Sequence, residues 1–165
     1  MSIRRFYDRW PQYTRRMTEA IGGLTAEQLA IRHGPEGWPI WATVGHNAGG
    51  RAYWLCGVLG EPGDGTPFSA PFEEGWEDDL AHPRTAEELV WAMESTGAVI
   101  ERVLDRWTPD MLHERIERHY GGSVQVHTRS SILQRLLTHD AWHAAQLSDA
   151  LASHGLPDID LWRND

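Results

Sequence analysis

The sequence has only one cysteine, Cys56, in 165 residues, so a disulfide within the chain is excluded and nothing indicates an oxidising compartment. No segment approaches the roughly 20 consecutive apolar residues of a membrane span, and the first residues lack the apolar stretch of a signal peptide. Basic residues are also few: 15 Lys and Arg stand against 24 Asp and Glu, a formal net charge of −9. These absences argue against membrane insertion and nucleic-acid binding, and we expect a cytoplasmic protein.

Tryptophan, by contrast, is abundant, with nine residues. Apolar residues make up 41% of the chain and charged residues 24%, which is ordinary globular composition. The length suits one domain over residues 1–165. Because indole is costly to leave exposed, we expect some tryptophans in the core and the others at a pocket or a subunit interface.

Helical periodicity recurs in four segments. Apolar residues three or four apart predict a first helix that ends at Gly22-Gly23, with Pro11 either kinking it or lying in its first turn. Further helices are expected at about 40–59, 85–107 and 128–153, and the patterns Thr25–Gln28 and Thr85–Glu88 predict capping boxes. Residues 115–127 predict a small hairpin. The predicted fold class is all-α, a four-helix bundle with this hairpin before the fourth helix.

A long acidic loop, residues 60–84, joins the second and third helices. It carries three aromatic residues, Phe68, Phe72 and Trp76, so we expect it to pack against the helices as a lid or flap. Its consecutive carboxylates are expected to form a solvated acidic face: Glu73, Glu74, Glu77, Asp78 and Asp79.

Two histidines in the fourth helix, His139 and His143, are four residues apart and so share one helix face. Two imidazoles at this spacing can bind one metal ion at about 2.0–2.1 Å each. With nine histidines in the chain such a pair is common by chance, but these two border an apolar arc and should face the bundle interior. The arc consists of Ile132, Leu133, Leu136, Leu137, Ala144, Leu147, Ala150 and Leu151.

A third metal ligand must come from another helix, and His46 in the largely apolar second helix is the best candidate. Glycines 49 and 50 follow it by about one turn and would allow a ligand or a backbone to come close. Asp140 lies near the middle of the apolar arc, where a carboxylate needs a partner. It either accepts a ring N–H from a metal-binding histidine or pairs with an arginine of another helix. Gln146 is either a polar boundary residue or part of the site.

The run Trp41-Ala-Thr-Val-Gly-His46-Asn and the later stretch Leu137-Thr-His139-Asp-Ala-Trp-His143-Ala-Ala-Gln146-Leu resemble the DinB-like superfamily. This superfamily includes YfiT-type metal-dependent hydrolases and bacterial thiol-dependent transferases. The resemblance spans nearly the whole chain. It implies a four-helix bundle, a zinc or nickel ion on His46, His139 and His143, a homodimer, and a low-molecular-weight thiol as a substrate.

Two classes of function follow. Three imidazoles leave a divalent metal with at least one open position, which is typical of catalytic sites. The first hypothesis is therefore a metal-dependent transferase or hydrolase acting on a small molecule that enters past the 60–84 loop, although no general acid or base is assigned. The second is a non-catalytic metal-binding or interaction module with a structural metal, and a bundle without metal is the third. Access of water to the metal distinguishes the first two.

The remaining histidines and the cysteine are not expected to act in a site. Cys56 should be an inert core residue. Six histidines in or near loops and helix ends should be solvated: His33, His82, His113, His119, His127 and His154.

Overall fold

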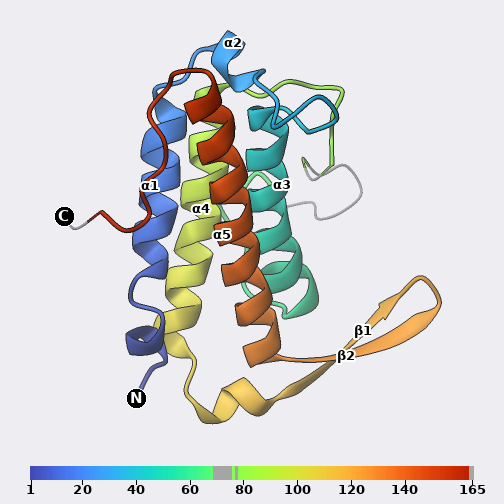
Figure 1. The fold of residues 1–165 in the computed structure, drawn as a ribbon. Helices are drawn as coiled ribbons and strands as arrows, with labels where there is room; N and C mark the ends of the chain where they lie inside the picture. The colour runs from blue at the N-terminus through green and yellow to red at the C-terminus, as the bar shows by residue number, and fades with distance from the viewer. Residues whose placement is uncertain (69–75, 77, 164–165) are drawn as a thin grey trace.

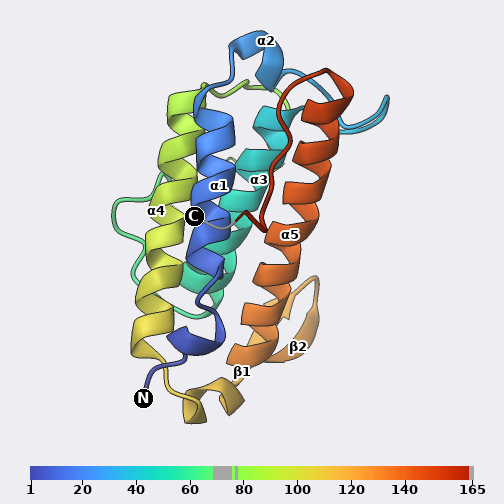
Figure 2. The same cartoon turned by 60° about the vertical axis from the view of Figure 1, so that its left-hand side comes forward.

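The structure is a computed structural model that describes residues 1–68, 76 and 78–163. Its long helices are α1 (Trp10–Gly22), α3 (Ile40–Ala52), α4 (Ala86–Arg106) and α5 (Arg129–Ser153). They lie side by side, with α4 in contact with α1 and α3, and α3 in contact with α5 (Figures 1 and 2). The short elements are η1 (Arg4–Phe6), α2 (Ala26–Leu29), η2 (Tyr53–Val58), η3 (Asp110–His113), β1 (Arg115–Tyr120) and β2 (Ser123–Thr128). The predicted, mostly helical fold is confirmed.

The helix boundaries follow local capping signals. Pro11 lies in the first turn of α1, so the helix begins there and is not kinked. Both predicted capping boxes form, at Thr25 and at Thr85. A third box, in which the Thr128 side chain accepts from the Ser131 backbone N–H, begins α5. Each of these signals lies within a few residues of the boundary that it sets.

The second predicted helix, residues 40–59, consists of two kinds of helix. The α-helix ends at Ala52, and the chain continues as a π-helical segment, η2. The wider turn of a π-helix shifts the side chains that follow it, and such segments are frequent near functional sites. Here η2 supplies Tyr53 and Trp54, and the Trp54 ring centroid lies 5.0 Å from that of His127, which lines the pocket described below.

The predicted hairpin is present as a two-stranded antiparallel sheet, which projects away from the helices in Figure 1. Ile116 pairs with His127, and Tyr120 pairs with Ser123. The two turn residues, Gly121 and Gly122, both have positive φ angles, 56° and 77°, as a tight hairpin turn of this length requires. The strand β2 leads directly into α5, and this connection places His127 at the start of the helix that carries His139 and His143.

Two clusters of buried apolar side chains fill the space between the helices. Trp10 and Trp107 are among the largest fully buried side chains, whereas Trp91, Trp142 and Trp162 are exposed. Some tryptophans therefore lie in the core, as predicted, and others are exposed.

The described part of the 60–84 loop packs against the helices. Phe68 is buried in a core cluster, and its ring centroid lies 5.7 Å from that of Trp76. The predicted contribution of Phe72, and of the carboxylates at 73, 74 and 77, falls outside the described residues. Within the described part of the chain, no helix is both long and apolar enough to cross a membrane.

Candidate metal centre

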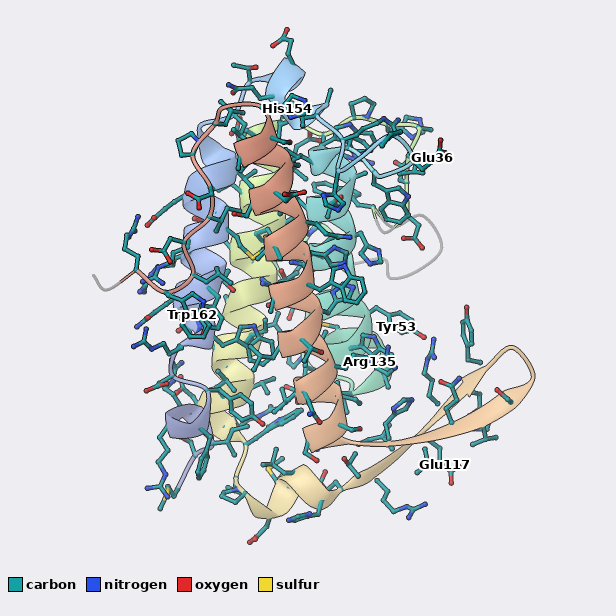
Figure 3. The ribbon with its side chains drawn as sticks, viewed as in Figure 1. Glu36, Tyr53, Glu117, Arg135, His154 and Trp162 are labelled. Carbon is teal, nitrogen blue, oxygen red and sulfur yellow. The ribbon has the colours of Figure 1, made fainter. Side chains whose placement is uncertain are left out.

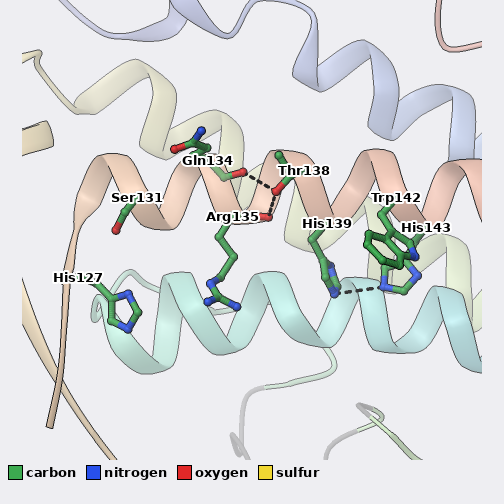
Figure 4. Close-up of a pocket in the computed structure, with 8 residues that line it drawn as sticks. All are labelled: His127, Ser131, Gln134, Arg135, Thr138, His139, Trp142 and His143. Atoms are coloured by element: carbon green, nitrogen blue, oxygen red, sulfur yellow. Dashed lines mark hydrogen bonds between the residues drawn. The ribbon is translucent and has the colours of Figure 1, made fainter.

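The three predicted histidines converge on one point between α3 and α5. His46 comes from α3, and His139 and His143 come from successive turns of α5. The Nε2 atom of His139 lies 3.0 Å from that of His46 and 3.1 Å from that of His143, the second of these marked by a dashed line in Figure 4. One potential ligand atom from each residue falls within 4.8 Å of the others. The packing of α3 on α5 thus joins residues that are 93 positions apart in the chain.

The other ring nitrogen of each histidine, Nδ1, is hydrogen-bonded to a side-chain oxygen. His139 Nδ1 lies 3.1 Å from Asn47 Oδ1, and His143 Nδ1 lies 2.8 Å from Gln146 Oε1. The third ring is bonded in the same way, with His46 Nδ1 2.8 Å from an oxygen of Asp78. Because these oxygens accept, each Nδ1 carries the proton and each Nε2 of a neutral ring presents a lone pair. Such outer hydrogen bonds fix the tautomer and orientation of metal-binding histidines.

The electrostatic environment keeps two of the rings neutral. The pKa of His139 falls from 6.5 to about 3, chiefly because burial disfavours the charged ring, and secondarily because of the nearby charges of His143, His46, Arg51 and Arg135. Burial also lowers the pKa of His143, and the neighbouring His46 adds to this shift. Hydrogen bonding by Gln146 and the charge of Asp140 partly oppose it. Neutral imidazole is the form that binds metals.

This donor set fits a metal ion better than it fits a hydrogen-bonded cluster. With Nδ1 protonated on all three rings, the Nε2 atoms face one another as acceptors with no hydrogen between them. A metal ion at 2.0–2.1 Å from each nitrogen, with angles between 90° and the tetrahedral value, places the nitrogens about 2.9–3.4 Å apart. The observed separations of 3.0 and 3.1 Å lie in this range. A bound cation would satisfy all three lone pairs at once.

Two pockets open beside the histidine cluster. The larger, of about 740 Å³, runs along α5 and is shown in Figure 4. Its lining residues are His127, Ser131, Gln134, Arg135, Thr138, His139, Trp142 and His143. A smaller pocket, of about 290 Å³, is lined by His46, His143, Gln146 and Trp38 among others. The cluster is therefore accessible to small molecules.

Asp140 pairs with an arginine of another helix, which is the second of the two roles considered for it. Its carboxylate is 1% exposed and accepts hydrogen bonds from Arg51 Nε at 3.0 Å and Arg51 Nη2 at 2.7 Å. It also accepts from the indole N–H of Trp10 at 2.6 Å. The carboxylate thus pairs with an arginine of α3, and does not orient a histidine ring through a hydrogen bond. Helical geometry explains this, because Asp140 follows His139 by one residue and points about 100° away from it around α5.

Gln146, for which two roles were open, contacts the site directly through His143. Three further residues near the site were not assigned a role from the sequence. Asn47, directly after His46, is fully buried and contacts His139. Asp78 was expected to be solvated, and its side chain is indeed 65% exposed, yet it contacts His46. Arg135 precedes His139 by one helical turn, so the spacing that identified the two histidines could also have found it.

The expectation of solvated histidines holds for His82, His113, His119 and His154, which are exposed. His33 and His127 were also expected to be solvated, but both are half-buried: His33 lines the smaller pocket and His127 the larger. Cys56 is half-buried, and burial raises the pKa of its thiol. A raised thiol pKa is consistent with the predicted inert cysteine.

Comparison with known proteins agrees with the resemblance noted in the sequence. A crystal structure of a DinB-like protein from Bacillus cereus ATCC 10987 superimposes with a TM-score of 0.70 over 96% of each chain, at 18% sequence identity, which shows a common fold. No curated protein matches the sequence. The model of the DinB superfamily matches residues 11–147, a span that includes His46, His139 and His143. The chain therefore belongs to the DinB superfamily.

Proposed function

We propose that His46, His139 and His143 hold one divalent transition metal, zinc or nickel, and that the protein is a metal-dependent enzyme acting on a small molecule. One observation carries the proposal: three Nε2 atoms converge, each on a ring whose Nδ1 is bonded to a side-chain oxygen. Imidazole nitrogens suit zinc and nickel equally, so cellular supply decides between them.

The protein's own residues prepare the site in two ways. Asn47, Gln146 and Asp78 hold the rings in the orientation that a metal ion needs. Burial keeps His139 and His143 unprotonated near neutral pH. When bound, a divalent metal would supply the positive charge that makes a water or a thiol nucleophilic at neutral pH.

The larger pocket favours an enzyme over a non-catalytic metal-binding module. Structural metal sites are closed by four protein ligands, whereas catalytic sites keep a position for water or substrate. Here three protein ligands are available within the described residues, and the pocket reaches two of them, His139 and His143. A structural metal that only stabilises the helices remains the alternative.

Within the enzyme proposal, thiol-dependent transfer is favoured over hydrolysis by the family resemblance. We propose a low-molecular-weight thiol as one substrate and a homodimer as the assembly, and the reacting partners enter through the larger pocket.

The first test is elemental analysis of protein purified without an affinity tag. We expect about one zinc or nickel ion per chain. His143→Ala should lose most of this metal, and His119→Ala, which removes an exposed histidine from β1, should keep it. Native protein without metal, even after incubation with zinc and nickel salts, would refute the metal site.

A second test separates the enzyme from the module. Metal-loaded protein is assayed for transfer of small thiols to electrophiles and for hydrolysis of esters and amides, with His143→Ala as the inactive control. Turnover that depends on His143 supports the enzyme. A protein that binds one metal per chain, loses stability when the metal is removed and is inactive in both assays would instead be the module.

A further inference from the structure

We infer that the larger pocket contains an anion-binding site, centred on Arg135 one helical turn from the histidine cluster, and that the small-molecule substrate carries a carboxylate that binds there. The link to a substrate rests on the proposed function. The anion site itself does not require a metal ion.

Arg135 stands in line with the histidines. It precedes His139 by four residues and His143 by eight, so the three side chains share one face of α5, and Arg135 lies about 6 Å along the helix axis from His139. Arg135 lines the pocket together with both histidines. Figure 4 shows Arg135 and His139 extending from α5 towards α3, with His127 beyond Arg135. A molecule whose reacting group lies at the histidine cluster can therefore place another group at Arg135.

The guanidinium of Arg135 has no carboxylate partner among the described residues. Its Cζ atom lies 4.9 Å from the ring centroid of Trp54, and this stacking is the contact that holds it. Arg129, six residues earlier on the same helix, differs: it pairs with both Glu114 and Glu61. Within residues 1–68, 76 and 78–163, the five N–H donors of Arg135 thus remain available to a ligand in the pocket.

A second arginine approaches the same indole. Arg118 of β1 places its Cζ atom 5.0 Å from the Trp54 centroid. It is fixed there by hydrogen bonds to the Tyr53 hydroxyl at 2.7 Å and to Gln125 Oε1 at 2.8 Å. Figure 3 places Tyr53 and Arg135 at the end of the helices nearest the hairpin. Two guanidinium groups gathered on one ring concentrate positive charge in a protein whose formal charge is −9.

His127 adds a third polar group to this region. Its ring centroid lies 5.0 Å from that of Trp54, and its Nε2 atom is buried with no hydrogen-bond partner in the described structure. A buried nitrogen without a partner is costly, and a bound ligand oxygen would satisfy it. Like the guanidinium of Arg135, this nitrogen lacks such a partner among the described residues, and the two groups together point to a bound ligand.

A carboxylate fits these groups. Its two oxygens match the planar fork of a guanidinium in a bidentate contact, and one of them can accept from His127 when Nε2 carries a proton. Beside the histidines the pocket is lined by Trp142, which is 67% exposed and offers an apolar surface to the body of the ligand. The substrate class is therefore a small carboxylate with its reacting group about one helical turn from the anion.

The anion site is tested by calorimetric titration of the purified protein with succinate and with its neutral analogue, succinamide. Native protein should bind succinate at least about tenfold more tightly than succinamide, and Arg135→Gln should remove this preference. Arg15→Gln, which removes the same charge from an exposed position on α1, should preserve it. Equal binding of the two probes by native protein, or equal effects of the two substitutions, would overturn the inference.

Repeating the titration after metal removal separates this inference from the proposed function. If the protein as purified contains no metal, even after incubation with zinc and nickel salts, and succinate binding still requires Arg135, the anion site stands and the proposed metal site fails. If one metal per chain is present and Arg135→Gln leaves succinate binding unchanged, the anion site fails and the metal site stands.

Discussion

The buried ion pair between Asp140 and Arg51 allows a direct test of how the helices are held together. The substitution Asp140→Asn removes one of the two charges of the pair without changing the shape of the side chain. Arg51 is 0% exposed and Asp140 is 1% exposed, so water cannot replace the lost carboxylate. The pair joins α3 to α5 directly beside the histidine cluster. The substitution should therefore destabilise the fold, with Arg51 left charged and uncompensated in the interior.

The size of the effect follows from the contacts. The carboxylate accepts two hydrogen bonds from Arg51, at 3.0 and 2.7 Å, and one from Trp10, at 2.6 Å. An asparagine side chain keeps one acceptor oxygen and presents an NH2 group to a donor. Breaking a buried pair by removing one partner typically costs about 3–5 kcal/mol. The exposed pair of Arg4 and Glu101, at 3.2 Å, should contribute at most about 1 kcal/mol, so Glu101→Gln is the matched control.

Urea unfolding of metal-free protein, followed by circular dichroism, measures both effects. The free energy of unfolding of a domain is about 5–15 kcal/mol, so a loss of about 3–5 kcal/mol lowers the urea midpoint by a large fraction of its value. Replacing both partners together, Arg51→Met with Asp140→Leu, should recover part of the loss because no unpaired charge remains, although the buried Trp10 N–H then loses its acceptor. The reasoning fails if Asp140→Asn destabilises no more than Glu101→Gln, or if the double variant is as unstable as the sum of its single substitutions.

Three further predictions concern the site and the packing. Asn47→Ala should weaken metal binding about 10–100-fold, because the His139 ring loses the acceptor that orients it; a chelator competition titration measures this, and unchanged affinity would contradict it. The stability of the metal-free protein should fall as the pH drops from about 6.5 towards 3, because in this window the unfolded chain binds a proton at His139 that the folded protein, with a pKa of about 3, does not. Urea unfolding across this range should therefore show a steeper pH dependence for native protein than for His139→Gln, and equal slopes would refute the assignment. Gly97→Ala should cost about 1–3 kcal/mol, because the added Cβ would lie 2.9 Å from Cγ2 of Thr14 and force α1 and α4 apart. Gly23→Ala, with no atom within 4 Å of the new Cβ, should leave the thermal midpoint unchanged or slightly raised, and similar effects of the two substitutions would rule out this packing argument.

The sequence by itself determined several helix boundaries and the first two members of the histidine cluster. Capping boxes at Thr25 and Thr85 and the glycine pair of the hairpin act through bonds and backbone angles within a few residues. His139 and His143 share a face because four residues make about one helical turn. Apolar spacing over 40–59 does not distinguish an α-helix from a π-helix, and for this reason the change at Tyr53 was not predicted.

The tertiary structure decided which side chains meet across the helices. Arg51 lies 89 residues from Asp140, and Asp78 lies 32 residues from His46. Sequence patterns report which face of one helix a residue occupies, but not which residue of another element lies opposite. From the sequence alone, Asp140 therefore has two equally suitable partners. The tertiary structure decides between them, because α3 places Arg51 against it. The gathering of Arg118, Arg135 and His127 around Trp54 likewise depends on how the hairpin returns to α5, because only packing brings these separate elements to one side of the pocket.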